Sequence, residues 1–498
     1  MNSSNQKLAI TRRRFLALAT ASAGILAAAC GADESPDFSG MPALTERQKQ
    51  VLEESADVAS AGSRSTRVPL PSQPLKVHPL WSTFGPTRGQ YRGVVNRAGS
   101  LDEAAPRLEM VRFRQAVDGN TIGRSIALMA DTEPLDLLVF PAEALQDLED
   151  NDLLVPLDKV SDVGEAVKSE NYWPGMLESG RIKGRQLAIP LQAGPWLLMY
   201  REKQLEEYGI ADPSDLPWNA EQFSENTSRL TLVGGDSKGA DQYGFLQMVS
   251  TDSTNISISV PPSWVWMVAA GSRLPDREGY EEALQEPAAI AGLGVMNDLI
   301  NRHRSVYKVT RTTSGRQIRG LINDRRVLMM SFPVNSGWFL STWRDAVSND
   351  IQLAALPGGD RRRTPTEVHM MVGVSSWSEH TDFAMAALAN MYKSVGDQVF
   401  PSAVRADLGM MATVAPALNP ADTVAIQAAL ERSQPINLSK VEKKLLTERL
   451  DSPIALEQIA PEEAAKGAAE ALLQFRIAEQ NRRNRPPAPP PGPPPGTG

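Results

Sequence analysis

Cysteine is almost absent from this chain, whose 498 residues contain only Cys30. A single cysteine excludes an internal disulfide framework, and four histidines with no H-x-x-x-H pair do not favour a zinc or redox centre. The chain also lacks a G-x-x-x-x-G-K-[ST] loop, which argues against a P-loop nucleotide site. These absences predict a protein that uses no metal and no cofactor.

Excess positive charge is lacking as well. The 51 lysines and arginines are outnumbered by 59 aspartates and glutamates, which gives a formal net charge of −8. Nucleic acids and anionic membrane surfaces are bound by basic faces, so neither is expected as a partner. The apolar stretch Leu16–Ala29 has 14 residues. It is shorter than the roughly 20 residues that a membrane-spanning helix needs.

The first thirty residues have the features of an export signal. Arg12 and Arg13 precede the charge-free stretch Leu16–Ala29. A basic segment followed by a short apolar core is typical of a cleavable signal peptide, and an arginine pair before Phe-Leu resembles the twin-arginine signal. We therefore predict that residues 1–29 are a signal peptide.

Cys30 stands at the predicted cleavage point, directly after three alanines. This arrangement resembles a bacterial lipobox, in which the cysteine receives a diacylglycerol and becomes the first residue of the mature chain. Leu26 lies four positions before Cys30, whereas the lipobox leucine usually lies three before. The resemblance implies an extracytoplasmic lipoprotein that is anchored to the cell membrane through Cys30. Cleavage by the ordinary signal peptidase is the alternative.

The rest of the chain is too long for one core. Removing 29 of 498 residues leaves 469, whereas a single core stops growing near 250–300 residues. Residues 30–72 are polar and predict a flexible tether, and the Pro-rich residues 481–498 predict a disordered tail. Between them, short apolar runs alternate with amphipathic stretches, which predicts an α/β fold.

Residues 134–140 read PLDLLVF and residues 152–158 read DLLVPLD. These passages resemble family 1 extracellular solute-binding proteins, which include maltose-type and other sugar-binding proteins. The first is similar to the family's buried strand that delivers a loop to the ligand cleft, and the second is similar to the turn that follows. Further landmarks occur in the family's order between roughly residues 72 and 478, at 186–200, 223–232, 243–245, 264–271, 327–338, 351–357, 372–374 and 461–464.

This resemblance implies a two-lobed periplasmic-binding-protein fold of type II, in which each lobe is a β-sheet flanked by helices and a hinge joins the lobes. The implied boundaries are 73–190 plus 375–415 for lobe 1 and 191–374 plus 416–480 for lobe 2. It also implies a monomeric, non-enzymatic protein that captures a mono- or oligosaccharide by hinge closure and passes it to the permease subunits of an ABC importer.

A sugar site needs flat aromatic platforms and planar hydrogen-bonding groups. The residues predicted to contact ligand are Trp338, Trp264, Trp196, Trp81, Phe140, Glu143, Gln192, Asn335 and His369. Each has a plain structural alternative, since an isolated tryptophan is more often core packing and a polar residue at a strand end is often only solvated. Gly194 stands where maltose-binding members of the family often place an acidic ligand contact.

Two other functions remain open at this point. An exported glycan-active hydrolase is possible, because paired carboxylates on different strands have no recognisable sequence spacing. A ligand-binding subunit of a sensor would use the same fold, and peptides or polyols would suit the same kind of cleft. The basic run Arg361–Arg363 lies between a Pro-Gly-Gly-Asp segment and Thr-Pro, which favours a solvated turn over a phosphate site.

Overall fold

The computed structural model describes residues 71–80, 86–101, 106–111, 135–159, 161–214, 217–233, 240–248, 260–274, 279–309, 315–334, 350–358, 363–405 and 418–484. The chain divides into two compact units, Met1–Pro69 and Leu70–Gly498, and every described residue belongs to the second. The predicted signal peptide and nearly all of the tether lie outside the described residues. Within the described residues, no helix is both long and apolar enough to cross a membrane.

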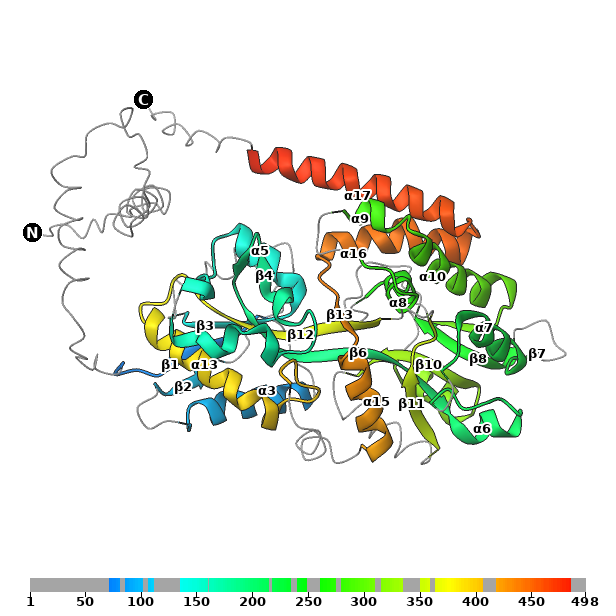
Figure 1. Cartoon of the computed structure of the whole chain (residues 1–498), viewed down its shortest axis with the longest axis horizontal. Helices are drawn as coiled ribbons and strands as arrows, with labels where there is room; N and C mark the ends of the chain where they lie inside the picture. The colour runs from blue at the N-terminus through cyan, green and yellow to red at the C-terminus, as the bar shows by residue number, and fades with distance from the viewer. Residues whose placement is uncertain are drawn as a thin grey trace, which may run out of the picture. The chain divides into compact units, whose positions relative to one another are not determined.

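The second unit contains a large mixed sheet with helices packed against it (Figure 1). In the first half of the sheet and around it lie β1 (Leu75–Pro79), α3 (Pro86–Ala98), β2 (Leu108–Met110), β3 (Leu137–Phe140), η2 (Ala142–Ala144), α5 (Leu145–Asp150), η3 (Leu157–Lys159), η4 (Ser161–Val167), η5 (Ser169–Asn171), η6 (Leu177–Gly180), β4 (Arg181–Ile182), β5 (Arg185–Gln186) and α13 (Thr381–Gln398). Two long strands, β6 (Ile189–Arg201) and β12 (Thr364–Val374), continue into the second half, and α15 (Pro420–Leu430) packs against both and against β11.

The second half of the sheet is built from the middle and the end of the chain. Its elements are α6 (Glu202–Glu207), α7 (Ala220–Arg229), β7 (Leu232–Val233), β8 (Ala240–Met248), α8 (Pro262–Ala269), α9 (Tyr280–Ala283), α10 (Pro287–Asn297), η7 (Asp298–Arg302), β9 (Val306–Val309), α11 (Gly315–Asn323), β10 (Val327–Pro333), β11 (Ile351–Ala355), β13 (Ser433–Pro435), α16 (Lys440–Leu446), η8 (Thr447–Asp451), η9 (Pro453–Glu457) and α17 (Pro461–Asn484). Because α17 continues to Asn484, the first residues of the predicted disordered tail are helical.

Strand pairing explains how the two halves are joined. Among the described residues the sheet order is β2-β1-β3-β12-β6-β10-β8-β7, with β11 also paired to β6, β13 to β12 and β9 to β8. The first half of β6, from Ile189 to Pro195, pairs with β12, and its second half, from Trp196 to Arg201, pairs with β10 and β11. One strand therefore belongs to both halves of the sheet, as the two-lobed fold predicted from the sequence requires.

Two hydrophobic cores fill the unit. The first core contains the buried residues of β1, β3 and α13, and the second contains those of α8, α10 and α17. Side chains of β6 alternate between them after the crossing, with Leu197 in the first core and Leu198 in the second, because successive strand residues point to opposite faces. The strand β3 is buried on both faces, which is why its sequence is an unbroken apolar run.

Local signals in the sequence fix several helix starts. α16 begins with a capping box, in which the Ser439 side chain accepts from the Glu442 backbone N–H and the Glu442 carboxylate accepts from the Ser439 backbone N–H. Equivalent boxes begin α7 and α15 at Asn219 and Asn419. These caps satisfy backbone donors that a helix start leaves unpaired, and they set the first residue of the helices that flank the sheet.

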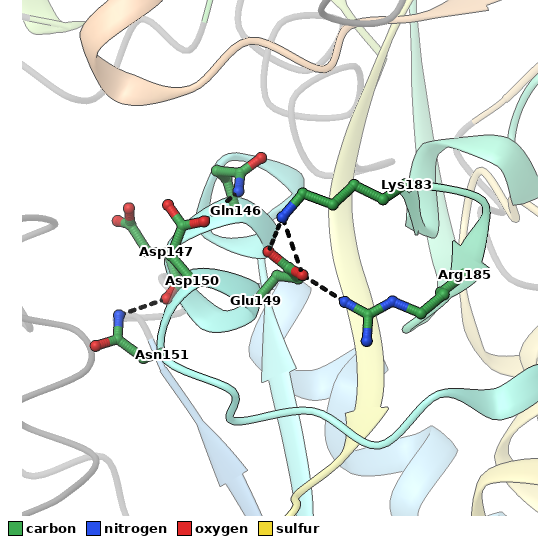
Figure 2. A network of polar contacts seen from close by, with 7 residues as sticks. All are labelled: Gln146, Asp147, Glu149, Asp150, Asn151, Lys183 and Arg185. Atoms are coloured by element: carbon green, nitrogen blue, oxygen red, sulfur yellow. Dashed lines mark hydrogen bonds and ion pairs between the residues drawn. The ribbon is translucent and has the colours of Figure 1, made fainter. Parts of the chain in front are cut away.

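A buried carboxylate anchors α5 to the β4–β5 hairpin (Figure 2). Glu149 is almost fully buried, and its two oxygens accept from Lys183 Nζ and from a guanidinium nitrogen of Arg185. The exposed face of the same helix is held by Gln146 Nε2, which donates to Asp150 Oδ1 at 2.7 Å. Burying a carboxylate is tolerable only when it is paired in this way, so the network fixes the segment that directly follows η2.

Candidate functional site

The point where β6 and β12 cross between the halves of the sheet brings together polar groups from both strands. Trp196 Nε1 donates to Glu367 Oε1 at 3.1 Å, and His369 Nε2 lies 2.8 Å from Glu367 Oε2. The Glu367 side chain is 5% exposed and that of His369 is 22% exposed. A buried carboxylate is thus held between an indole and an imidazole at the crossing.

Strand geometry explains this contact. Glu367 pairs with Gly194 across the ladder, and Trp196 is two residues further along the same face of β6. Since glycine has no side chain, the Glu367 carboxylate occupies the space beside Gly194 and reaches the neighbouring indole. A carboxylate on the neighbouring strand β12 thus lies beside Gly194.

His369 is aimed by a β-bulge. Val368 pairs with Ala193 and Met370 pairs with Gln192, so the residue between them on β12 has no partner on β6. A bulge inserts one extra residue and redirects its side chain, and such features often lie next to functional sites. His369 is also the one half-buried residue of β12, whose other residues are all buried. Solvent therefore reaches the imidazole but not the other side chains of the strand.

A second contact bridges segments that belong to different cores. Glu143 lies in η2, between Ala142 and Ala144 of the first core, and its carboxylate forms an ion pair with Lys443 of α16. Leu446, at the end of α16, belongs to the second core. The side chain of Glu143 is 28% exposed and that of Lys443 is 19% exposed, so solvent reaches both partners. This ion pair joins the predicted ligand-side loop after β3 to the start of α16.

Further charged residues lie near Lys443. Arg476 of α17 lies 3.1 Å from Glu281 and 3.8 Å from Glu442, the neighbour of Lys443. Its guanidinium is also stacked over the ring of Tyr280, 4.9 Å from the ring centroid. α16 is therefore held on its core side by an ionic network, while Lys443 is presented on the other side toward Glu143.

Three of the predicted ligand contacts have packing roles instead. Trp264 is 1% exposed in α8 and packs edge-to-face on Tyr280, with ring centroids 5.4 Å apart. Phe140 is fully buried at the end of β3, and Gln192 is fully buried with its amide donating to the Phe400 carbonyl at 3.0 Å. All three side chains are buried in this structure, and their contact with ligand stays a prediction. α8 is apolar on all sides and is therefore a buried helix rather than a wall of a cleft.

The remaining predictions fall in two groups. Trp196, Glu143 and His369 lie at the crossing or at the end of β3, where they were expected to be. Trp81, Asn335 and Trp338, together with Arg12, Arg13 and Cys30 of the predicted signal, lie outside the described residues.

Lys443 and Glu367 were not predicted. Glu367 could not have been found from the sequence, because its position beside Gly194 depends on the register between β12 and β6.

The described residues of the candidate site can act through hydrogen bonds and charge. Within the described parts of the chain, no group of three His, Cys, Asp or Glu side chains is placed to hold a metal ion. The crossing supplies a carboxylate, an imidazole and an indole N–H, and the separate Glu143–Lys443 contact supplies a second carboxylate and an ammonium. Groups of these kinds can donate to and accept from the hydroxyls of a polar ligand.

Comparison with known proteins places the fold. No protein-family model and no curated protein sequence matches the chain. Solved structures do match: the sugar-binding protein MalE from Xanthomonas citri has a TM-score of 0.61 at 15% identity, over 82% of this chain and 99% of that one. UgpB from Mycobacterium tuberculosis, in complex with glycerophosphocholine, has a TM-score of 0.59 at 16% identity, over 82% of this chain and 100% of that one.

A third match is the GacH receptor of Streptomyces glaucescens GLA.O, a structure solved without ligand and with acarbose. It has a TM-score of 0.58 at 13% identity, over 81% of this chain and 99% of that one. Each of the three alignments covers the matched protein almost completely. The two-lobed fold predicted from the sequence is therefore confirmed. The chain has the architecture of the solute-binding proteins to which these structures belong.

Proposed function

We propose that this protein is an exported, lipid-anchored solute-binding protein that captures a carbohydrate-like ligand between two lobes and presents it to an ABC importer. The observation that carries the proposal is the crossing of β6 and β12, on which Trp196, Glu367 and His369 meet. Similarity to sugar-binding proteins over about four-fifths of the chain supports it. The protein acts by binding and release and is not an enzyme.

The proposed mechanism is closure about the crossing strands. Opening the lobes would separate groups such as Glu143 and Lys443, which fall in the two different lobes expected from the sequence. A ligand that contacts both lobes binds the closed form more tightly, and this difference in affinity shifts the population toward closure. The permease subunits of the importer then recognise the closed form. No chemical bond is broken, so the ligand leaves unchanged.

The proposed ligand contacts combine residues on both sides of the crossing. Glu143, Lys443 and His369 supply hydrogen bonds to ligand hydroxyls, and Trp196 supports the cluster through Glu367. Trp81, Trp338 and Asn335 are proposed as additional contacts from the sequence resemblance. Aromatic rings suit the C–H faces of a sugar, and carboxylates and amides suit its rim of hydroxyls.

A thermal-shift screen against sugars, polyols, amino acids, glycerophosphodiesters and peptides tests the ligand class. A ligand that binds only the native state stabilises it by about 2.7 kcal/mol at a hundredfold excess over Kd. We expect a carbohydrate to raise the melting temperature, and His369→Ala to reduce that shift. Stabilisation by peptides alone would reject the carbohydrate class.

Export and anchoring are tested separately. Cys30→Ser should release the protein from the membrane fraction into the soluble extracytoplasmic fraction, and Arg12→Lys with Arg13→Lys should retain it inside the cell. Mass spectrometry of the mature N-terminus should find a diacylglycerol on Cys30. An unmodified N-terminus would instead support cleavage by the ordinary signal peptidase.

Two alternatives have direct discriminators. An exported glycan-active hydrolase would shorten an oligosaccharide during prolonged incubation, whereas a binding protein returns it intact, as chromatography of the recovered ligand would establish. A sensor subunit would bind the same ligand but would not support its uptake. Loss of uptake in a deletion strain, restored by the wild-type chain, favours the importer.

A further inference from the structure

A pocket of about 570 Å³ lies between α15, β11, residues 212–214 and Pro217, and neither Glu143 nor Lys443 lines it. One wall is the β-sheet at Ala354 and Leu356, and the opposite wall is a row of small apolar residues on α15, including Ala425 and Ala428. The volume is in the range of pockets that hold small molecules.

The two ends of this pocket differ in charge. At the start of α15, Asn419 Nδ2 lies 3.4 Å from Gln352 Oε1, and Gln352 Nε2 donates to Glu202 at 3.2 Å. At the other end, the Arg432 carbonyl accepts from the Thr364 backbone N–H at 2.9 Å, directly after Arg363. α15 has 11 residues. At 1.5 Å per residue, the acidic and basic ends are about 16 Å apart.

The acidic end is satisfied by the protein itself. Asp212 Oδ1 accepts from the Tyr200 hydroxyl at 2.6 Å and from the Ser214 hydroxyl at 2.7 Å, and Glu202 accepts from Gln352. Tyr200 and Gln352 are paired across β6 and β11, which keeps these partners in place. The carboxylates of the pocket therefore have donors within the chain and do not require a ligand.

The arginines at the basic end of the pocket lack partners of this kind within the described residues. Within the described part of the chain, neither Arg363 nor Arg432 is paired with a carboxylate. Burial lowers the pKa of Arg363, and the charge of the nearby Arg273 acts in the same direction. Guanidinium groups pair bidentately with carboxylate, sulfonate or phosphate oxygens. The basic run in the sequence thus ends at a pocket wall and not only in a solvated turn.

The apolar wall beside these arginines is partly open to solvent. Val424 of α15 lines the pocket and is 62% exposed, an unusual position for a branched apolar side chain. Ile426 and Leu430, on the opposite side of the same helix, are buried in the first core. The exposed side of α15 could therefore be covered by the apolar part of a bound molecule.

We propose that this pocket is a second binding site, for a small amphipathic anion whose acidic group pairs with Arg363 and Arg432 and whose apolar body lies along α15. None of the described residues that line this pocket is a proposed sugar contact, and its occupant differs from a sugar in being charged and partly apolar.

The probe for this proposal is 8-anilinonaphthalene-1-sulfonate, with the uncharged N-phenyl-1-naphthylamine as its matched control. We expect one sulfonate probe to bind per chain with enhanced fluorescence. Arg363→Gln combined with Arg432→Gln should raise its Kd about tenfold, equivalent to about 1.4 kcal/mol, and should leave the Kd of the neutral probe unchanged. Arg363→Lys with Arg432→Lys should restore part of the affinity.

Two further variants locate the bound probe. Val424→Asp should weaken binding of the sulfonate, whereas Ile477→Asp, at an exposed position of α17, should not. Lys443→Met should leave the Kd unchanged, because Lys443 lies at the proposed cleft. An effect of Lys443→Met in place of the arginine variants, or equal losses for both probes, would overturn the proposal. If the double arginine variant is unstable, Arg432→Gln alone suffices, since Arg432 is exposed.

Discussion

The carboxylate of Glu143 and the ammonium of Lys443 form an ion pair although 300 residues separate them in the sequence. The first follows β3 and is flanked by residues of the first core, and the second lies on α16, which ends in the second core. Because both side chains are partly buried, their attraction is screened less than that of a surface pair.

We expect a double-mutant cycle of Glu143→Gln and Lys443→Met to give a coupling energy of about 1 kcal/mol in urea unfolding. The exposed pair Lys444–Glu448, 3.7 Å apart on the same stretch of chain, is the control and should give no more than about 0.5 kcal/mol. Equal coupling in the two pairs would show that the contact between the cores contributes no more than an ordinary surface pair.

The indole of Trp196 depends on Glu367 for its hydrogen bond. Glu367→Ala would leave the buried Nε1–H unpaired, which costs about 1–3 kcal/mol of unfolding free energy. Glu367→Gln keeps an acceptor at the same place and should cost less. Chemical denaturation of the two variants measures the difference. An equal loss in the two variants would mean that the charge, rather than the hydrogen bond, stabilises the crossing.

The packing of α10 against α8 requires a glycine at one position and not at another. A Cβ added at Gly292 would lie 2.4 Å from the Trp266 carbonyl oxygen, whereas one added at Gly294 meets nothing within 4 Å. Gly292→Ala should therefore destabilise the protein by about 1–3 kcal/mol through overpacking. Gly294→Ala should stabilise it by up to about 1 kcal/mol, because alanine favours the helix.

These two variants make a matched pair on one helix, and their melting temperatures should shift in opposite directions. Destabilisation by both would indicate that small residues are needed along α10 for a reason other than contact with α8. Circular dichroism of both variants would verify that the helix content is retained.

Asp451 should make stability depend on pH. Its side chain is fully buried, and its Oδ1 accepts from the Ser263 backbone N–H at 2.9 Å at the start of α8. Burial raises the pKa of Asp451 to about 7, although the hydrogen bonds from Ser263 act in the opposite direction. In the unfolded chain the pKa is about 3.9.

Between about pH 4 and pH 7 the unfolded state therefore loses a proton that the folded state keeps, so the free energy of unfolding falls as pH rises and levels off above about pH 7. Asp451→Asn removes the titrating carboxyl, and with it this fall in the free energy of unfolding. We expect its stability relative to wild type to rise by at most about 4 kcal/mol from pH 4 to pH 8. Urea unfolding at both pH values measures it, with the exposed Asp324→Asn as control. A difference that does not change with pH would contradict the assignment.

The sequence by itself determined the architecture, because the relevant signals are local. The apolar run at β3 predicts a strand buried on both faces, and the order of short landmarks predicts a two-lobed fold. The acidic residues at the start of α17 predict a helix there, as observed. Strand burial and helix capping depend on neighbouring residues, so they can be recognised without knowing the pairing of distant segments.

Only the tertiary structure decided which polar and aromatic residues meet. Glu367 faces Gly194 because of the register between β12 and β6, and the register shift at His369 leaves its side chain partly exposed. Trp264 and Trp196 are both buried in the second core, yet Trp264 packs on Tyr280 whereas the Trp196 indole N–H donates to Glu367 at the crossing. Register and packing between distant segments are fixed by the burial of whole faces, and no local pattern specifies them.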